Sequence, residues 1–164
     1  MSCVTSDTPL ILETRAPEET ERLGKVLAGL LERGVVVALR GDLATGKTCL
    51  VRGMAGHFTN EPEVHSPTFT LVNRYGEDPP LYHLDLYRIA GPDELADLGY
   101  EELFDPDGVC VIEWAERAGN FLPMRRVDLF LEHAGGDLRR IEIHSGGVLS
   151  GGWQKTLESA LAAD

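Results

Sequence analysis

The chain has 164 residues, 43% of them hydrophobic, which suits one ordinary domain with a buried core and is too short for two comfortable ones. Its formal net charge of -12 repels a phosphate backbone, which argues against direct binding of nucleic acid. Apolar runs stay well below the roughly 20 residues that cross a bilayer, and the N-terminus lacks the basic start of a signal peptide. We therefore expect a single cytoplasmic domain over residues 1–164, without a membrane association.

The first part of the chain predicts strands and helices in alternation. Residues 10–14 (LILET) indicate a strand, and Pro17 opens a helix with an acidic first turn and an apolar leucine face, which we expect Gly34 to end. Residues 35–39 (VVVAL) are apolar without alternation, as expected of a strand covered on both faces in a parallel sheet. A helix from Lys47 to about His57 follows.

The later elements predict antiparallel pairs. Residues 68–75 and 81–89 flank the turn-rich GEDPP and indicate a hairpin. After them we expect one or two short helices over 91–104, a buried strand over 109–114, a hairpin of 127–133 with 138–145, and a C-terminal helix from Trp153. The mixture predicts an α/β domain of three layers around a mixed, parallel plus antiparallel, central sheet.

A glycine-rich loop joins the strand at 35–39 to the next helix. Residues 41–48 (GDLATGKT) match the phosphate-loop pattern Gly-x-x-x-x-Gly-Lys-Thr in its strand-to-helix context, which predicts a P-loop NTPase domain. Gly41 and Gly46 would let the backbone approach phosphates, and the amides between them would hold the β- and γ-phosphates at the helix N-terminus. Lys47 would neutralise those oxygens and the Thr48 hydroxyl would coordinate Mg²⁺. The chain has no Asn-Lys-x-Asp segment for guanine recognition, so ATP is the expected nucleotide.

Two carboxylates end predicted strands and are candidates for the metal. Asp85 follows LYHL, and Glu113 closes the apolar run VCVI; such residues bind Mg²⁺ or orient an attacking water in many phosphate-loop enzymes. Either could instead be a solvated strand-end carboxylate. His83 shares a strand face with Asp85, but two residues do not make a closed metal site, and we expect a hydrogen-bonded structural histidine.

Five segments together resemble one protein family. In the same order and at similar spacing, GDLATGKTCLVRG, HSPTFTLVNRY, YHLDLYRI, DELADLGYEELF and VIEWAE resemble the bacterial TsaE family, formerly YjeE. The resemblance implies a P-loop ATPase required for threonylcarbamoyladenosine at position 37 of tRNAs. In this family the ATPase associates with the TsaB and TsaD proteins, and ATP binding and hydrolysis support turnover of that transferase complex. The tRNA would be contacted only indirectly, through the complex.

The resemblance also implies roles for individual residues. Lys47, Asp85 and Glu113 would be catalytic, with Thr48, Glu113 and Asp85 at the Mg²⁺ and Asp85 a candidate for water activation. Ser66, Pro67, Thr68 and Thr70 resemble the first switch segment. The nucleotide would be bound by Thr20, Gly41, Asp42, Leu43, Ala44, Thr45, Gly46, Lys47, Thr48, Cys49 and Trp114. Family members often read Gly-Asp-Leu-Gly-Ala-Gly-Lys-Thr-Thr here, so Ala44, Thr45 and Cys49 depart from the pattern.

Two other functions stay open at this point. A small-metabolite kinase would suit the size and the loop, but it should carry an arginine-rich lid, and the basic residues here are sparse and dispersed. A nucleotide-sensing protein without catalysis is the other alternative. For the ATP hydrolase we expect slow turnover alone and faster turnover with partners, because no arginine finger is evident from the sequence.

Overall fold

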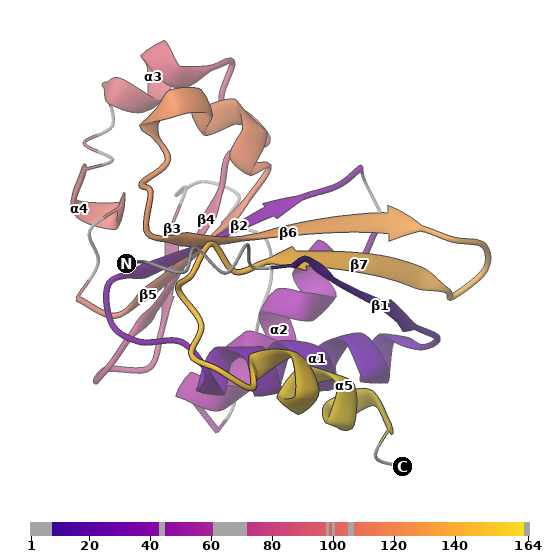
Figure 1. The fold of residues 1–164 in the computed structure, drawn as a ribbon. Coiled ribbons are helices and arrows are strands. Elements are labelled where there is room, and N and C mark those ends of the chain that lie inside the picture. Colours follow the sequence, from indigo (N-terminus) through magenta and orange to yellow (C-terminus); the bar gives the residue numbers. More distant parts are fainter. Residues whose placement is uncertain are drawn as a thin grey trace, which may run out of the picture.

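A seven-stranded sheet runs through the part of the chain that the computed structural model describes, which is residues 8–42, 45–60, 72–97, 99, 101–104 and 107–162 (Figure 1). Its strand order is β1-β7-β6-β2-β5-β4-β3. The strands are β1 (Leu10–Thr14), β2 (Val35–Arg40), β3 (Val72–Tyr75), β4 (Leu81–Asp85), β5 (Val109–Glu113), β6 (Arg126–His133) and β7 (Arg139–His144). The helices are α1 (Pro17–Gly29), α2 (Lys47–Phe58), α3 (Pro92–Ala96), α4 (Glu101–Phe104), the 3₁₀ helix η1 (Ala115–Phe121) and α5 (Trp153–Ala162).

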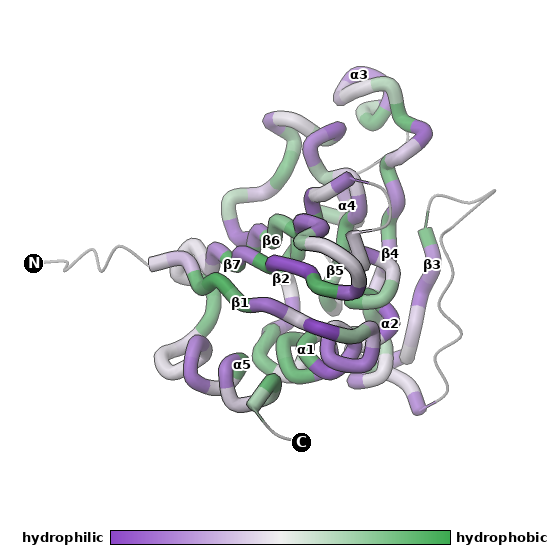
Figure 2. The backbone as a smooth tube through the Cα atoms, turned by 90° about the vertical axis from the view of Figure 1, so that its right-hand side faces the viewer, coloured by the Kyte–Doolittle hydropathy of each residue, from purple (hydrophilic) through white to green (hydrophobic). Residues whose placement is uncertain are grey.

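Helices cover both faces of the sheet, which gives the three layers expected from the sequence. In the two views at right angles, α1, α2 and α5 lie below the strands and α3 lies above them (Figures 1 and 2). Helix α4 belongs to the same face as α3, since Phe104 and Leu95 share one apolar cluster. Each face has its own apolar cluster, one including Leu23, Leu50 and Leu129, the other including Leu84 and Ile112. The α/β fold with a mixed sheet is therefore confirmed.

The central strand β2 is parallel to both of its neighbours. Val37 pairs with Val111 of β5 on one side and with Val127 of β6 on the other. Strand β4 continues the parallel part beside β5, whereas β3, β7 and β1 pair antiparallel. Residues 35–39 are fully buried, as expected for a strand covered on both faces. The carboxyl ends of β2, β5 and β4 consequently meet at one edge of the sheet.

Helices α1 and α2 make the tightest contact between helices on the lower face. A Cβ atom at Gly53 would lie 1.9 Å from the carbonyl oxygen of Glu21, and one at Gly24 would lie 2.3 Å from that of Leu50. Only glycine permits the backbones to approach this closely. The contact fixes α2, and with it the end of the glycine loop, against α1.

The ends of α1, β4 and β5 differ from the sequence predictions. Helix α1 ends at Gly29, before the expected Gly34, because the amides of Leu30 and Leu31 bond to carbonyls three residues back and tighten the last turn. Gly34, with φ 89°, instead donates its N–H to the Gly108 carbonyl just before β2.

Strand β4 stops at Asp85 instead of continuing to residue 89, since a turn follows in which the Ile89 amide bonds to Leu86. Strand β5 ends at Glu113, one residue early, because Trp114 is left-handed. The 3₁₀ helix η1 was not predicted at all. In the described part of the chain, none of the helices has the length and apolar character needed to span a bilayer.

Candidate nucleotide site

The loop between β2 and α2 is built around two glycines with positive φ. Gly41 has φ 150° and Gly46 has φ 98°, and Gly46 directly precedes the first residue of α2, Lys47. A Cβ atom at Gly41 would lie 2.5 Å from the Leu131 carbonyl oxygen of β6, so a larger residue would push the loop off the sheet. The loop therefore turns sharply from the end of β2 into the N-terminus of α2, where free amides favour anions.

The Lys47 side chain folds over the start of the loop. Its ammonium donates to the Asp42 carbonyl at 2.9 Å and also to the Gly41 carbonyl, and it lies 4.1 Å from the centroid of the Trp114 ring. Only 5% of the residue is exposed. Burial lowers the pKa of Lys47, while the nearby carboxylates, Glu113 foremost, oppose that shift. A cation is thus held at the loop by carbonyl oxygens and an aromatic face.

The carboxylate of Glu113 joins the loop to the neighbouring strand. One oxygen, Oε1, accepts a hydrogen bond from the Thr48 hydroxyl at 3.3 Å. The other, Oε2, lies 2.5 Å from Nε2 of His83. Glu113 is 3% exposed and His83 is fully buried. Two of the three residues expected at the metal, Thr48 and Glu113, are therefore in contact, and the histidine is hydrogen bonded as expected.

Asp85 lies next to Glu113 because the two end adjacent parallel strands in register. Its Oδ1 accepts a hydrogen bond from the Tyr87 amide at 2.9 Å. Burial raises the pKa of Asp85; the Tyr87 amide opposes this rise and the negative charge of Glu113 adds to it. Asp85 is thus a partly buried carboxylate with greater basicity than an ordinary aspartate, placed beside the Glu113 carboxylate.

Trp114 packs beside the loop against Tyr87 and Arg117. It has φ 59°, a left-handed conformation that is uncommon for a residue other than glycine and that turns the chain from β5 into η1. Its ring centroid is 5.1 Å from that of Tyr87, and the Arg117 guanidinium carbon is 5.9 Å from each ring. The tryptophan expected beside the nucleotide therefore lies beside Lys47.

Thr20 and Cys49 connect the loop to α1. The Thr20 hydroxyl is hydrogen bonded to that of Thr14 at 2.7 Å, and its methyl group would be 3.8 Å from a Cβ atom at Gly46. The Cys49 thiol donates to the Pro17 carbonyl at 3.2 Å, and burial raises the pKa of this thiol. Thr20 lies on α1, and the Cys49 thiol contacts the first residue of that helix. The predicted roles of both residues in nucleotide binding stay predictions.

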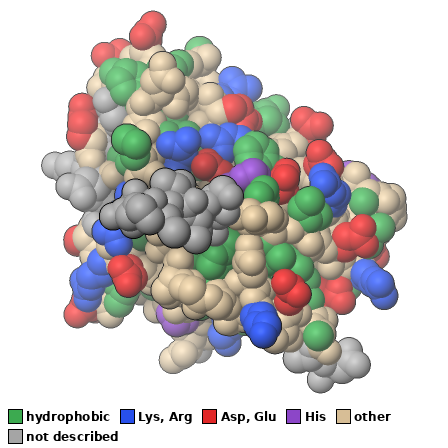
Figure 3. Space-filling model, in the orientation of Figure 1, with side chains coloured by type: hydrophobic (Ala, Val, Ile, Leu, Met, Phe, Trp, Pro, Cys, Tyr) green, Lys and Arg blue, Asp and Glu red, His purple; other side chains and the backbone are tan. Residues whose placement is uncertain are grey.

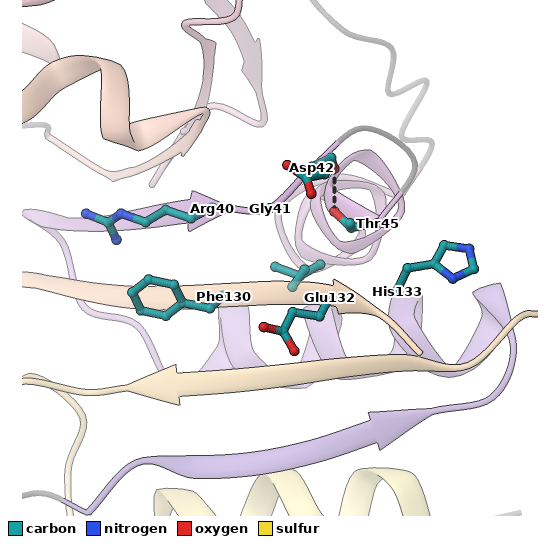
Figure 4. A pocket seen from close by; sticks show the side chains of 8 residues that line it. Arg40, Gly41, Asp42, Thr45, Phe130, Glu132 and His133 are labelled. Atoms are coloured by element: carbon teal, nitrogen blue, oxygen red, sulfur yellow. Dashed lines mark hydrogen bonds between the residues drawn. The ribbon is translucent and has the colours of Figure 1, made fainter. Parts of the chain in front are cut away.

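A cavity of about 480 Å³ opens beside the loop, between the ends of β2 and β6 (Figure 4). On its loop side, the Thr45 hydroxyl donates to the Asp42 carbonyl at 2.9 Å, which closes a tight turn. At its other end, Arg40 forms an ion pair with Asp128 at 2.5 Å and lies over the Phe130 ring. The lining residues are Arg40, Gly41, Asp42, Thr45, Phe130, Leu131, Glu132 and His133.

Comparisons with known proteins agree with the motifs in this geometry. The family model described as threonylcarbamoyl adenosine biosynthesis protein TsaE matches residues 14–141. The chain belongs to the TsaE family. It is 45% identical over 118 residues to a tRNA threonylcarbamoyladenosine biosynthesis protein TsaE of Treponema pallidum, covering 72% of this chain and 87% of that one. For the Bacillus subtilis protein of that description, the identity is 41% over 126 residues, covering 76% and 78%.

A solved structure shares the fold of this TsaE-family chain. The crystal structure of Bacillus subtilis YdiB superposes with a TM-score of 0.71 at 31% identity, and the match covers 93% of this chain and 94% of that one. The match extends beyond the residues that carry the motifs, so the TsaE likeness holds for the whole arrangement of strands and helices.

The TsaE motif residues are only partly within the described chain. Those of the loop, with Asp85, Glu113 and Trp114, are brought to one edge of the sheet. Leu43 and Ala44, and the switch residues Ser66, Pro67, Thr68 and Thr70, lie outside the described residues. Sequence reasoning missed the β6 contribution from Phe130, Glu132 and His133, because no local pattern indicates that β6 pairs with β2.

Proposed function

We propose that this chain is a Mg²⁺-dependent ATP hydrolase that supports the formation of threonylcarbamoyladenosine in tRNA. The observation that carries the proposal is the contact between Thr48 and Glu113 directly beside Lys47. A structural glycine turn would not need a buried lysine and a buried carboxylate at the same place, because burying each charge costs free energy. An enzyme that binds a phosphate chain and a cation uses both.

The oxygens of Thr48 and Glu113 suit a magnesium ion. Mg²⁺ prefers hard oxygen ligands and usually keeps several waters and phosphate oxygens, so one carboxylate and one hydroxyl are a sufficient protein contribution. Among the described residues no group of three His, Cys, Asp or Glu side chains could hold a metal ion, which agrees with a site that nucleotide oxygens complete. When bound, Mg²⁺ would neutralise charge on the β- and γ-phosphates.

The loop residues then have separate tasks in hydrolysis. The amides at the start of α2 and the Lys47 ammonium would hold the phosphate oxygens, for which Lys47 must leave its present carbonyl partners. A water attacks the γ-phosphorus while the bond to the β–γ bridging oxygen breaks, giving ADP and phosphate. Asp85, whose pKa burial raises, would orient this water and accept its proton. The cavity beside Thr45 has room for the nucleoside part.

The acidic surface favours partner proteins as the tRNA-binding component. The net charge is -12, and on the face that Figure 3 shows, acidic and basic side chains are interspersed. Proteins that bind tRNA directly need a cluster of positively charged side chains. We therefore propose that the chain acts through a complex with the TsaB and TsaD proteins, in which ATP hydrolysis supports repeated turnover.

Phosphate release from ATP tests the proposal. We expect slow release by the isolated chain, faster release with TsaB and TsaD, and none in either condition with Lys47→Ala. Lys155→Ala, which changes an exposed lysine on α5, is the matched control and should behave as the wild type. Equal, rapid turnover with and without the partners would contradict the role in a complex.

The same assay separates the two alternatives. Transfer of labelled phosphate to a small hydroxyl compound would indicate a kinase; the segment 89–116, which contains α3 and α4, carries no lysine or arginine for a phosphate lid. Tight binding of ATP without any phosphate release in the assembled complex would indicate a nucleotide sensor.

A further inference from the structure

His83 forms a buried pair with Glu113, and the proposed chemistry gives this histidine no role. His83 lies in the middle strand of the β3, β4 and β5 group, two residues before Asp85, and it reaches Glu113 at the end of β5. The histidine is 0% and the glutamate 3% exposed. Their atoms Nε2 and Oε2 are 2.5 Å apart, which places them in a hydrogen bond.

The two ring nitrogens of His83 have different surroundings. Nε2 faces the carboxylate, whereas Nδ1 is buried and makes no hydrogen bond to any residue that the structure describes. The ring also stacks against Tyr75, with centroids 6.4 Å apart and an interplanar angle of 30°. A proton placed on Nε2 has an acceptor, and a proton placed on Nδ1 has none among the residues that the structure describes. The geometry therefore assigns the Nε2–H tautomer, which donates to Glu113.

The bond to Oε2 leaves the other oxygen of Glu113 for the loop. With Oε2 engaged by His83, Oε1 is the oxygen that meets the Thr48 hydroxyl at 3.3 Å. A glutamate side chain has three rotatable bonds, and a carboxylate without such a partner would sample several orientations at the strand end. The histidine holds it in one of them.

We infer that His83 is a positioning residue that orients the Glu113 carboxylate toward Thr48 and the proposed Mg²⁺ site. This rests on the proposed function, because it needs Glu113 to contribute to metal binding. Partners that orient a ligating group typically change metal affinity by about 10- to 100-fold when they are removed. His83 itself does not contact the nucleotide in this scheme.

Calorimetric titration of ATP, at a series of Mg²⁺ concentrations and in EDTA, measures the effect without relying on activity. For His83→Leu we expect the Mg²⁺ concentration that gives half of the full gain in ATP affinity to rise about tenfold or more. Affinity in EDTA should stay within about twofold of the wild type, because the loop that holds the phosphates is unchanged. His83→Gln, whose amide can donate in place of Nε2, should return the requirement to near the wild-type value.

Leu84→Val is the matched structural control. Leu84 is the next residue of β4, is also buried, and packs in the apolar cluster on the opposite face of the sheet. It should leave the Mg²⁺ requirement unchanged even where it lowers stability. A requirement that shifts equally in Leu84→Val and His83→Leu would overturn the inference, since it would report general loosening of the strand.

Glu113→Gln separates failure of the inference from failure of the proposed function. If Glu113→Gln raises the Mg²⁺ requirement and His83→Leu does not, the positioning role is overturned and the metal site stands. If neither variant has an effect, Glu113 does not hold the ion and both ideas fall. A His83→Gln protein that needs as much Mg²⁺ as His83→Leu would overturn the claim that the donated bond is what matters.

The tautomer gives a readout in the unaltered protein. Nitrogen-15 spectra of the imidazoles distinguish Nε2–H from Nδ1–H, and the His83 signals are those that disappear in His83→Gln. We expect the Nε2–H form in the absence of nucleotide and metal. The Nδ1–H form would overturn the inference, because Nε2 would then have no proton to give to Glu113.

Discussion

Lys47 has an unfavourable position for stability and a useful one for binding phosphate. Burial lowers its pKa, which means that the charged ammonium is less stable in the folded chain than in water. Its bonds to the Gly41 and Asp42 carbonyls offset only part of that cost. A residue that destabilises the free protein while serving the ligand is common at functional sites.

Replacing Lys47 by methionine should therefore separate stability from binding. We expect the free energy of unfolding of Lys47→Met to be unchanged or higher by up to about 1 kcal/mol, because an apolar side chain of similar length has no charge to desolvate. ATP affinity should fall at least about tenfold, as expected when a charged donor is lost. Urea unfolding and calorimetry measure the two, with Lys155→Met as control. A marked loss of stability together with normal ATP binding would contradict this reading.

Cys110 is the buried thiol of β5, and it should make the free energy of unfolding decrease as the pH rises. Burial raises the pKa of this thiol from its ordinary value of 9.0 to about 12. The unfolded chain thus loses the proton at lower pH than the folded chain does. The free energy of unfolding should fall by about 1.4 kcal/mol per pH unit as the pH rises above 9.0 toward about 12.

Cys110→Ala removes this contribution. The stability advantage of the wild type over the variant should shrink by about 1.4 kcal/mol between about pH 8 and about pH 10 in urea unfolding. An advantage that stays constant over this range would show that the thiol does not titrate as its burial requires.

At the scale of the elements, α2 contains two glycines whose replacement by alanine should affect stability in opposite ways. A Cβ atom at Gly53 would lie 1.9 Å from the Glu21 carbonyl oxygen of α1, whereas one at Gly56 would meet only the flexible end of Lys25, at 3.9 Å. Gly53→Ala must push the helices apart, and we expect a loss of roughly 1–3 kcal/mol. Gly56→Ala should be neutral or stabilising by up to about 1 kcal/mol, since alanine is the better helix former.

Thermal or urea unfolding of the two variants measures the difference, and each serves as the other's control. Because Lys47 and Thr48 begin the same helix, Gly53→Ala should also weaken ATP binding. Equal stability of the two variants would contradict the close crossing of α1 and α2.

Elements with a strong local signal were predicted well. The unbroken apolar run at 35–39 predicted β2, and the Gly-Lys-Thr of the loop predicted where α2 begins. The end of α1 and the 3₁₀ helix η1 were missed. Both depend on interactions that composition does not report: a tightened last turn at Leu30, and the left-handed Trp114 that redirects the chain after β5.

At the scale of the whole molecule, the sequence predicted the site only as far as its motifs reach. Lys47, Thr48, Asp85 and Glu113 could each be proposed from local pattern and resemblance. That Asp85 and Glu113 end side by side depends on β4 pairing in parallel with β5, which is a long-range choice. The cavity wall from Phe130 and its neighbours on β6 had no signal for the same reason.

The whole-molecule charge also predicts behaviour toward tRNA. With a net charge of -12, the isolated chain should bind tRNA more weakly than about 100 μM at physiological salt, and lowering the salt should strengthen binding little. Filter binding at two salt concentrations tests this, with the assembled partner complex as the positive control. Micromolar, strongly salt-dependent binding by the chain alone would contradict it.

The position of β2 between β5 and β6 has a consequence for how the chain folds while it is being synthesised. The ribosome completes residues 41–48 long before either neighbour of β2 exists, and the second of them, β6, ends only at residue 133. Until β5 is made, the apolar residues 35–39 have two unpaired edges, and until β6 is made one edge stays unpaired, a form of chain that tends to aggregate. The strands that flank the phosphate loop on the sheet are therefore complete only after residue 133, 85 residues beyond the end of the loop at Thr48, so the loop is expected to gain its fixed shape well after it has been synthesised.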